Sequence, residues 1–298
     1  MHERYFFTAA LLASLAAFPA VAQKPSTAQK PASTPAFPPY KAPRLPGTVH
    51  PDLNGIWQSF VTADWDIADH EAQPGPHPEI MGAYGAGPAG QSIIIEGSDD
   101  GKIPYLPSAL AKKKENFAKR TTVDVSSDET WHAAGDPEFK CYMPGVPRAT
   151  YMPFPFRIVQ GSSPYILIAY EFGSATRTIR MDTKEEAPTL SWMGWSRGRW
   201  DGETLVVDVT GFREESWFDR AGDYHSDELH VIERYTPASP YHMIYEATIE
   251  DPKVFSRPWK IGFPLYRRME RDVELLEFKC VPFTEELLFG RFRKQTSR

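Results

Sequence analysis

The fold is decided by the stretch Gly198-Arg199-Trp200-Asp201-Gly202-Glu203-Thr204-Leu205-Val206-Val207-Asp208. Its Asp201-Gly202 pair is the strongest short signal for a β-hairpin in the chain, because both central residues of a type I′ turn need positive φ. Apolar, β-forming residues lie on both sides of this turn, in Leu190–Trp200 before it and Thr204–Val209 after it. The stretch therefore predicts two antiparallel strands joined by a tight turn.

The same alternation of β-forming residues and turn residues continues on both sides of this hairpin. It predicts further strands over Phe156–Gln160, Tyr165–Phe172, Thr176–Asp182, Leu229–Tyr235, Met243–Ile249, Trp259–Met269 and Val273–Cys280. Sequential pairing of about eight strands describes an antiparallel meander, which must close or stack to hide its edges. We expect a mainly β fold, a meander closed as a lipocalin-like barrel, with one short helix (Ser108–Arg120, capped by Ser108) and an N-terminal loop layer. A two-sheet β-sandwich is the alternative.

The start of the folded part favours the barrel. Asp52-Leu53-Asn54-Gly55-Ile56-Trp57 contains a Gly-x-Trp motif at the beginning of a predicted strand. Proteins of the lipocalin and calycin group begin their barrels similarly, with the tryptophan closing one end and meeting an arginine from the last strands. This resemblance implies that Trp57 meets Arg267, Arg268 or Arg271.

Composition and termini predict an exported protein. Residues 1–22 combine Arg4, an apolar run and Ala20-Val21-Ala22, which is typical of a signal peptide with its cleavage site. Residues 23–48 are rich in Pro, Ser, Thr and Ala, so we expect a linker, followed by a single β-rich domain over residues 49–298. The expected location is periplasmic or secreted, where Cys141 and Cys280 form a disulfide or, alternatively, remain two buried thiols.

Charge and hydropathy exclude several classes of protein. The chain of 298 residues has a formal net charge of -6, which argues against a basic nucleic-acid groove. Its mean hydropathy is -0.43, and no segment of the mature chain qualifies as a membrane-spanning helix. Two cysteines are too few for a disulfide-dense miniprotein or a cysteine-rich zinc site. The oligomeric state does not follow from the sequence.

Three motifs are long enough to be specific: Asp136-Pro137-Glu138-Phe139-Lys140-Cys141-Tyr142-Met143-Pro144-Gly145-Val146-Pro147-Arg148, the Gly198–Asp208 stretch, and His230-Val231-Ile232-Glu233-Arg234-Tyr235. They resemble signatures of a large family of exported, β-rich bacterial proteins of unsettled function, and the similarity covers about Asp52 to Cys280. The resemblance implies a signal peptide and a β-rich domain. Many relatives follow the last cysteine with His-Glu-Gly-Asn, whereas Cys280 here precedes Val281-Pro282-Phe283, so any chemistry of that His and Glu is in doubt.

Two glycine-rich segments match known catalytic or binding motifs, but neither predicts an activity. Gly194-Trp195-Ser196-Arg197-Gly198 fits Gly-x-Ser-x-Gly, but it lies inside a predicted strand, whereas a nucleophile elbow needs a strand that turns into a helix. Gly85-Ala86-Gly87-Pro88-Ala89-Gly90 fits a dinucleotide fingerprint without the helix that a phosphate needs. We interpret the first as strand and the second as loop.

The loop over residues 217–228 is the best candidate for acid–base chemistry. His225 is the predicted acid or base, and Asp219 is the carboxylate predicted to orient it. The loop has no His-x-His, cysteine pair or His-Glu-x-x-His pattern, so no metal is predicted. A polar loop without chemistry is the alternative.

Glu233 is the second candidate catalytic residue. It shares a strand face with Leu229, Val231 and Tyr235, so an apolar inner face would bury its carboxylate. Burial would suit it to acid–base work, with Arg234 holding an anionic group. The alternative is a structural salt bridge to Arg199, Arg234 or Arg257.

Aromatic residues on the predicted strands favour an apolar cavity. Trp200, Trp217 and Tyr245 are the predicted ligand-binding aromatics, because such side chains combine apolar faces with polar tips. The sequence therefore predicts a barrel that binds a small, largely apolar or aromatic molecule, with cofactor-free hydrolase, lyase or isomerase chemistry on it. A non-catalytic carrier or an envelope interaction module is the alternative.

Overall fold

A computed structural model describes residues 40–74, 86–98, 100–120, 136–282 and 284. The predicted signal peptide and most of the predicted linker lie outside these residues. The last part of the predicted linker, residues 40–48, is folded, and Ala42 and Leu45 are buried. The folded unit therefore begins before the predicted boundary at residue 49.

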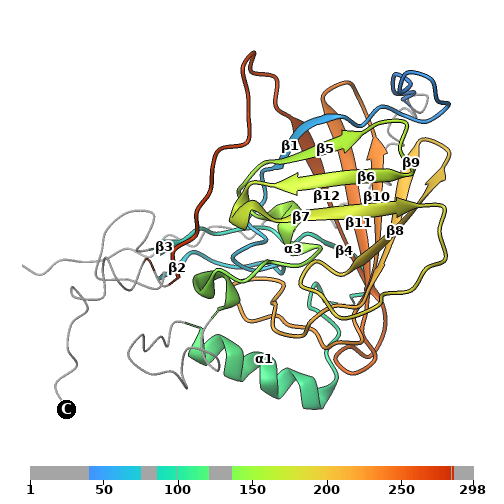
Figure 1. Ribbon diagram of the computed structural model, residues 1–298. Coiled ribbons are helices and arrows are strands. Elements are labelled where there is room, and N and C mark those ends of the chain that lie inside the picture. The colour runs from blue at the N-terminus through green and yellow to red at the C-terminus, as the bar shows by residue number, and fades with distance from the viewer. Residues whose placement is uncertain (1–39, 75–85, 99, 121–135, 283, 285–298) are drawn as a thin grey trace, which may run out of the picture. The chain divides into compact units, whose positions relative to one another are not determined.

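Nine strands form a closed barrel (Figure 1). β1 pairs with β5 on one side, where Trp57 faces Phe156, and with β12 on the other, where Trp57 faces Arg267. This double pairing closes the ring, which confirms the predicted barrel and excludes the two-sheet sandwich. The strands in ring order are β1 (Gly55–Ser59), β5 (Phe156–Gln160), β6 (Tyr165–Tyr170), β7 (Thr176–Met181), β8 (Trp195–Asp201), β9 (Thr204–Thr210), β10 (His230–Pro237), β11 (His242–Glu250) and β12 (Trp259–Arg267).

The remaining elements are short. β4 (Ile94–Glu96) adds to β12 outside the ring, and β2 (Gln73–Pro74) pairs with β3 (Ala86–Gly87). The other described elements are α1 (Pro107–Lys119), η1 (Pro137–Lys140), α3 (Arg148–Tyr151) and η2 (Phe172–Ser174).

The predicted helix is confirmed with a different N-terminus. α1 begins at Pro107, and its N-cap residue is Leu106, whose side chain makes no capping hydrogen bond. Ser108 therefore lies inside the first turn rather than at the cap. Proline suits the first helical position because its fixed φ matches the helix and its missing N–H has no partner there.

The predicted antiparallel pairing is wrong for one pair of neighbouring strands. β7 and β8 run parallel, with Ile179 opposite Ser196, whereas all other neighbouring strands of the ring are antiparallel. Residues 183–194 return the chain to the end at which β7 starts, as a parallel pair requires. The predicted strand Leu190–Trp200 included the end of this crossover.

The last predicted strand is also wrong. Residues 273–280 form no strand. They make up an irregular segment that comes after β12 in the chain and lies beside η2. The backbone N–H of Leu276 donates to Glu171, and the carbonyl of Phe278 accepts a hydrogen bond from Ser174. Phe278 also packs against Phe172, with ring centroids 5.1 Å apart. β12 pairs with β11 and β1 instead, and closes the ring without this segment.

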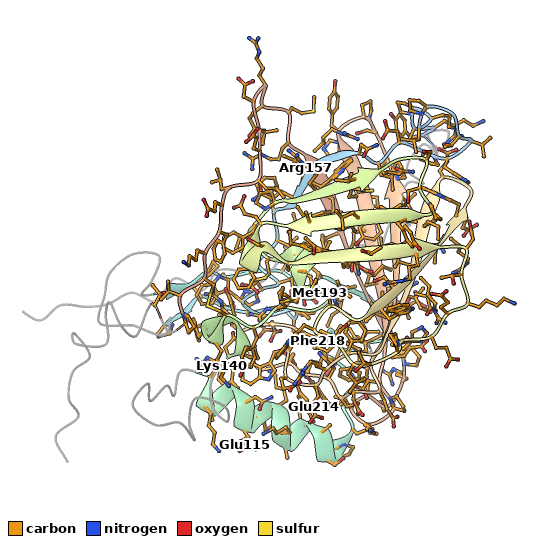
Figure 2. All side chains as sticks on the ribbon, viewed as in Figure 1. Glu115, Lys140, Arg157, Met193, Glu214 and Phe218 are labelled. Carbon is orange, nitrogen blue, oxygen red and sulfur yellow. A yellow bond between two sulfur atoms is a disulfide. The ribbon has the colours of Figure 1, made fainter. Side chains whose placement is uncertain are left out.

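Burial alternates along most strands of the ring, because every second side chain points into the barrel. β10 and β11 show this alternation over their full lengths. Figure 2 shows the side chains on the fold, with Phe218 labelled. Phe218 packs edge-on against Trp259 at the start of β12 and lies near Phe255.

The expected tryptophan–arginine contact is present. The Arg267 guanidinium lies 4.4 Å from the Trp57 ring centroid and donates to the carbonyl of Asn54. The indole N–H of Trp57 donates to the carbonyl of Leu53 at 3.0 Å. Gly55 has a φ of 142°, and a Cβ there would lie 2.5 Å from the arginine Nη1. The Gly-x-Trp motif therefore makes room for the arginine.

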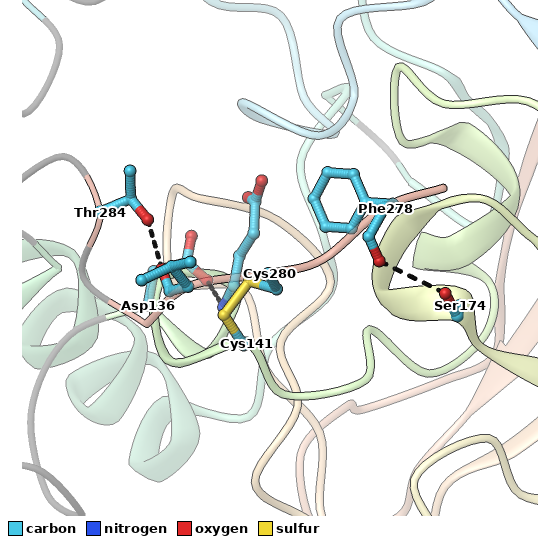
Figure 3. Close-up of a disulfide and its surroundings, with 8 residues drawn as sticks. Asp136, Cys141, Ser174, Phe278, Cys280 and Thr284 are labelled. Carbon is cyan, nitrogen blue, oxygen red and sulfur yellow. Dashed lines mark hydrogen bonds between the residues drawn. A yellow bond between two sulfur atoms is a disulfide. The ribbon is translucent and has the colours of Figure 1, made fainter. Parts of the chain in front are cut away.

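The disulfide between Cys141 and Cys280 is present, with the two Cα atoms 5.7 Å apart (Figure 3). Cys141 ends η1 in a left-handed conformation, with φ of 60°. The disulfide therefore ties the irregular segment after β12 to η1.

We predict that the double variant Cys141→Ala/Cys280→Ala is less stable than the oxidised protein. The disulfide spans 139 residues, and the chain-entropy treatment gives an upper value of about 5 kcal/mol, of which proteins commonly realise about 2–4 kcal/mol. Urea unfolding with and without dithiothreitol measures the difference. The reductant should destabilise the wild type to the level of the variant and leave the variant unchanged; equal stability of both proteins without reductant would contradict the prediction.

Candidate functional site

A polar cluster lies inside the barrel around Glu233. One oxygen of its buried carboxylate accepts hydrogen bonds from the hydroxyls of Tyr235 and Tyr245, each at 2.9 Å. The other oxygen lies 2.7 Å from Nη1 of buried Arg177 on β7, whose Nη2 donates to the Tyr235 hydroxyl. Glu233 therefore faces the interior as predicted, and its partner is Arg177 rather than Arg199, Arg234 or Arg257.

Arg234 does not join this cluster. It lies on the outer face of β10 and pairs with Asp201 at 2.8 Å. Adjacent residues of a strand point to opposite faces, so Arg234 cannot hold an anion beside Glu233. Arg234 and Glu233 therefore do not form one site, and the anion-binding role of Arg234 stays a prediction.

The three side chains that contact Glu233 keep their protons. Burial, and then the Glu233 charge, raise the pKa of Tyr235 and Tyr245 well above the usual range, so both hydroxyls stay protonated donors. Burial lowers the pKa of Arg177, but the Glu233 charge outweighs it and keeps the guanidinium charged. This arrangement supports the structural alternative for Glu233.

We predict that Arg177→Met strongly destabilises the protein, by about 3–5 kcal/mol, because it leaves a buried carboxylate without its cation. The double variant Arg177→Met/Glu233→Gln should recover part of the loss, since Tyr235 and Tyr245 can donate to the new amide oxygen. Arg234→Met, on the outer face of the same strand, is the control and should change little. Urea unfolding measures all three, and an Arg177→Met protein as stable as the control would exclude the cluster as a structural element.

His225 is buried and both ring nitrogens have partners. Nδ1 lies 2.9 Å from the Ser226 carbonyl, so this nitrogen donates, and Nε2 then accepts from the Ser216 hydroxyl at 2.9 Å. Burial lowers the pKa of His225. Phe212 and Phe218 lie against the ring, at 5.9 and 5.3 Å between centroids. The imidazole is therefore neutral and enclosed, which favours a structural role.

Asp219 does not orient His225, contrary to the prediction. Its carboxylate accepts hydrogen bonds from the backbone N–H groups of Ile67 and Asp223, each at 3.0 Å. Together with Asp66 and Asp223 it forms an acidic triad whose oxygens lie within 4.8 Å of one another. Oxygen ligands at this spacing suit a hard cation. Lys113 of α1 already brings a positive charge to the triad, 3.6 Å from Asp223.

Burial and repulsion between the carboxylates raise the pKa values of Asp66 and Asp219 in the triad. Burial, and then the neighbouring Asp223, raise the pKa of Asp66 to about 6. The same two causes raise the pKa of Asp219 well above the usual range. Tyr105 donates to Asp223 at 2.8 Å and so joins the triad to the segment before α1.

We predict that Asp66→Asn stabilises the protein at pH 8 and has little effect at pH 4. A folded-state pKa raised from 3.8 to about 6 means that the charged form costs stability above pH 6 and that the cost disappears as the pH falls below 4. The upper limit is about 3 kcal/mol, and partial exposure reduces the expected gain to about 1–2 kcal/mol. Asp227→Asn is the control, because the Lys253 hydrogen bond lowers the pKa of Asp227. Thermal unfolding across pH measures both, and a gain for Asp66→Asn that persists at pH 4 contradicts the prediction.

A buried ion network holds the Asp136–Arg148 motif. Arg148 donates to Asp64 at 2.9 Å, to Asp136 at 3.1 Å and to Glu138 at 2.8 Å. Arg220 adds two hydrogen bonds of 2.7 Å to Glu138. Burial would raise the pKa of Glu138, but the charges of Arg220 and Arg148 lower it to about 2. The motif that resembles a family signature thus has a structural role here.

The predicted ligand-binding aromatics are not brought together. Tyr245 is buried in the interior cluster. Trp217 forms an isolated β-bridge with Tyr224, and its carbonyl accepts a hydrogen bond from Arg148 at 3.5 Å. Only Trp200, of the three, lines a described pocket.

The Trp200 pocket has a volume of ≈780 Å³. It opens beside the β5–β6 turn, where β7 ends, and it is lined by Leu45, Gly47, Thr48, Val49, His50, Gln160, Gly161, Ser162, Ser163, Pro164, Ile166, Met181, Asp182 and Trp200. His50 stacks on Trp200, with 5.1 Å between centroids and an interplanar angle of 9°. The neighbouring segment is held in place by Arg44, which pairs with Glu203. The pocket therefore has a preformed aromatic wall.

Comparison of the chain with family models, curated proteins and solved structures found no match. Among the described helices, none has the length and apolar character needed to cross a membrane. The geometry of the pocket and of the buried clusters is therefore the basis for a functional assignment.

Proposed function

We propose that this protein is an exported barrel that binds a small, largely apolar or aromatic molecule in the Trp200 pocket. The observation that carries the proposal is the pocket itself, whose ≈780 Å³ fall within the range of small-molecule sites, about 300–1,000 Å³. Its aromatic wall comes from Trp200, one of the ligand contacts predicted from the sequence.

The lining favours an apolar ligand. Ile166, Met181 and Leu45 supply aliphatic surface. The amide of Gln160 is already engaged, because its oxygen accepts from the Leu53 N–H and its nitrogen donates to the Pro51 carbonyl, each at 3.0 Å. The pocket therefore offers a ligand a flat ring and aliphatic surface, with Thr48, Ser162, Ser163 and Asp182 as further polar side chains of its lining.

Binding without chemistry is the better supported form of this proposal. His225, Asp219 and Glu233 are buried and hydrogen-bonded to other residues of the protein, and none of them lines the Trp200 pocket. A carrier that takes up or delivers its ligand uses the pocket alone. This corresponds to the non-catalytic alternative from the sequence.

Export is the second part of the proposal. The Cys141–Cys280 disulfide favours an oxidising compartment, such as a bacterial periplasm or the cell exterior. The predicted signal peptide over residues 1–22 gives the route. A periplasmic or secreted carrier of an apolar compound fits both features.

We predict that Trp200→Ala weakens binding of the neutral fluorescent probe N-phenyl-1-naphthylamine by about tenfold, because aromatic stacking contributes about 0.5–1.5 kcal/mol beyond buried area. Trp195→Ala is the matched control. Trp195 lies on the same strand but faces outward, where the Arg180 guanidinium covers its ring at 3.4 Å. Fluorescence titration measures both, and equal weakening by the two variants, or none by Trp200→Ala, contradicts the proposal.

A further inference from the structure

A smaller pocket, of ≈290 Å³, lies beside the turn between β10 and β11 and shares no lining residue with the Trp200 pocket. Two side chains of opposite charge line it, the carboxylate of Asp52 and the guanidinium of Arg267. Neither of them forms a salt bridge with a residue that the structure describes. We call this cavity the Arg267 pocket.

Three contacts hold the Arg267 guanidinium in place and leave one nitrogen without a partner. Nε donates to the carbonyl of Pro240 at 3.1 Å, Nη1 donates to the carbonyl of Asn54, and the group lies over the Trp57 ring. Nη2 donates to no residue in the described part of the chain, and it is not among the atoms that are shielded from solvent. A ligand in the pocket can therefore reach Nη2.

The charge of Arg267 is only partly compensated by the protein. Burial lowers the pKa of Arg267, although the negative charge of Asp52 opposes this effect. A half-buried cation without a paired carboxylate favours a ligand that brings a negative group.

Asp52 also keeps one atom for a ligand. Its Oδ1 accepts hydrogen bonds from the backbone N–H and the side-chain amide of Asn54, at 2.9 and 2.8 Å. Its Oδ2 accepts none from the described residues, and this oxygen is also open to solvent. Asn54 thus contacts both charged groups and fixes them near each other, which lowers the entropy that binding costs.

The two charges together indicate the class of ligand. A ligand with only a carboxylate would be repelled by Asp52, and one with only an ammonium group would be repelled by Arg267. An α-amino acid carries both groups on one carbon, so it can satisfy both residues at once. Tyr241, which is 53% exposed, and Pro240 supply an apolar wall for its side chain. The volume, near the lower end of the range of about 300–1,000 Å³, suits a molecule of this size.

We propose that the Arg267 pocket binds a free α-amino acid with an apolar or aromatic side chain. Its carboxylate accepts from Nη2 of Arg267, its ammonium group donates to Oδ2 of Asp52, and its side chain packs against Tyr241. The site is separate from the proposed function, because the two pockets have no residue in common.

The test is a saturation-transfer NMR titration of the full chain at pH 7 with three probes. They are L-phenylalanine, 3-phenylpropionate, which lacks the ammonium group, and 2-phenylethylamine, which lacks the carboxylate. We expect L-phenylalanine to bind about tenfold more tightly than either analogue, because each analogue loses one charged hydrogen bond and leaves one charge of the pocket unpaired. Absence of L-phenylalanine binding, or an analogue that binds as tightly, overturns the proposal.

Two variants separate recognition of the charges from general packing. Asp52→Asn keeps an oxygen for Asn54 but removes the charge, so it should weaken L-phenylalanine binding about tenfold and tighten that of 3-phenylpropionate. Tyr241→Ala removes the apolar wall and should weaken both. Tyr165→Ala is the matched control, because Tyr165 is 52% exposed and lines none of the described pockets. If Asp52→Asn changes the affinities of both probes in the same direction, or changes neither, the proposal is wrong.

Discussion

Backbone pairing of β1 with both β5 and β12 is the constraint on which the rest of the structure depends. These two pairings join β1 to β5, about a hundred residues later in the chain, and to β12, about two hundred residues later. They leave no free edge in the ring. Once the ring is closed, the inward side chains of β10 and β11 are removed from water. Charged groups inside must then pair with one another, as Arg177 of β7 does with Glu233 of β10.

The two ends of the barrel are closed by different chemistry. At one end, the segment that includes Leu45 and His50 lies over Trp200, and a pocket remains beside it. At the other, α3 brings Arg148 into contact with buried carboxylates, and the loop that holds His225 and Asp219 packs into the same region. Ion pairs and hydrogen bonds thus hold Arg148, His225 and Asp219 in place at that end.

Much of the fold was predictable from local pattern. Alternation placed Glu233 on the inner face and Trp200 beside a hairpin, because side-chain direction repeats every two residues. The partner of Glu233 was not predictable, since the position of Arg177 depends on the register of three strand pairs, β7–β8, β8–β9 and β9–β10. For the same reason, the sequence did not show that the hydrogen-bond partners of His225 are Ser216 and Ser226 rather than a nearby carboxylate such as Asp219.

The parallel junction between β7 and β8 follows from the number of strands. In a closed ring, directions can alternate all the way round only when the count is even. Nine is odd, so at least one neighbouring pair must point the same way, and an eight-stranded ring would need no such exception. The odd number of strands therefore accounts for one parallel pair, which the crossover of residues 183–194 makes possible. The path of this crossover also explains why Gly211 must stay small. A Cβ there would lie 2.5 Å from the Cβ of Ala187, where the returning chain passes.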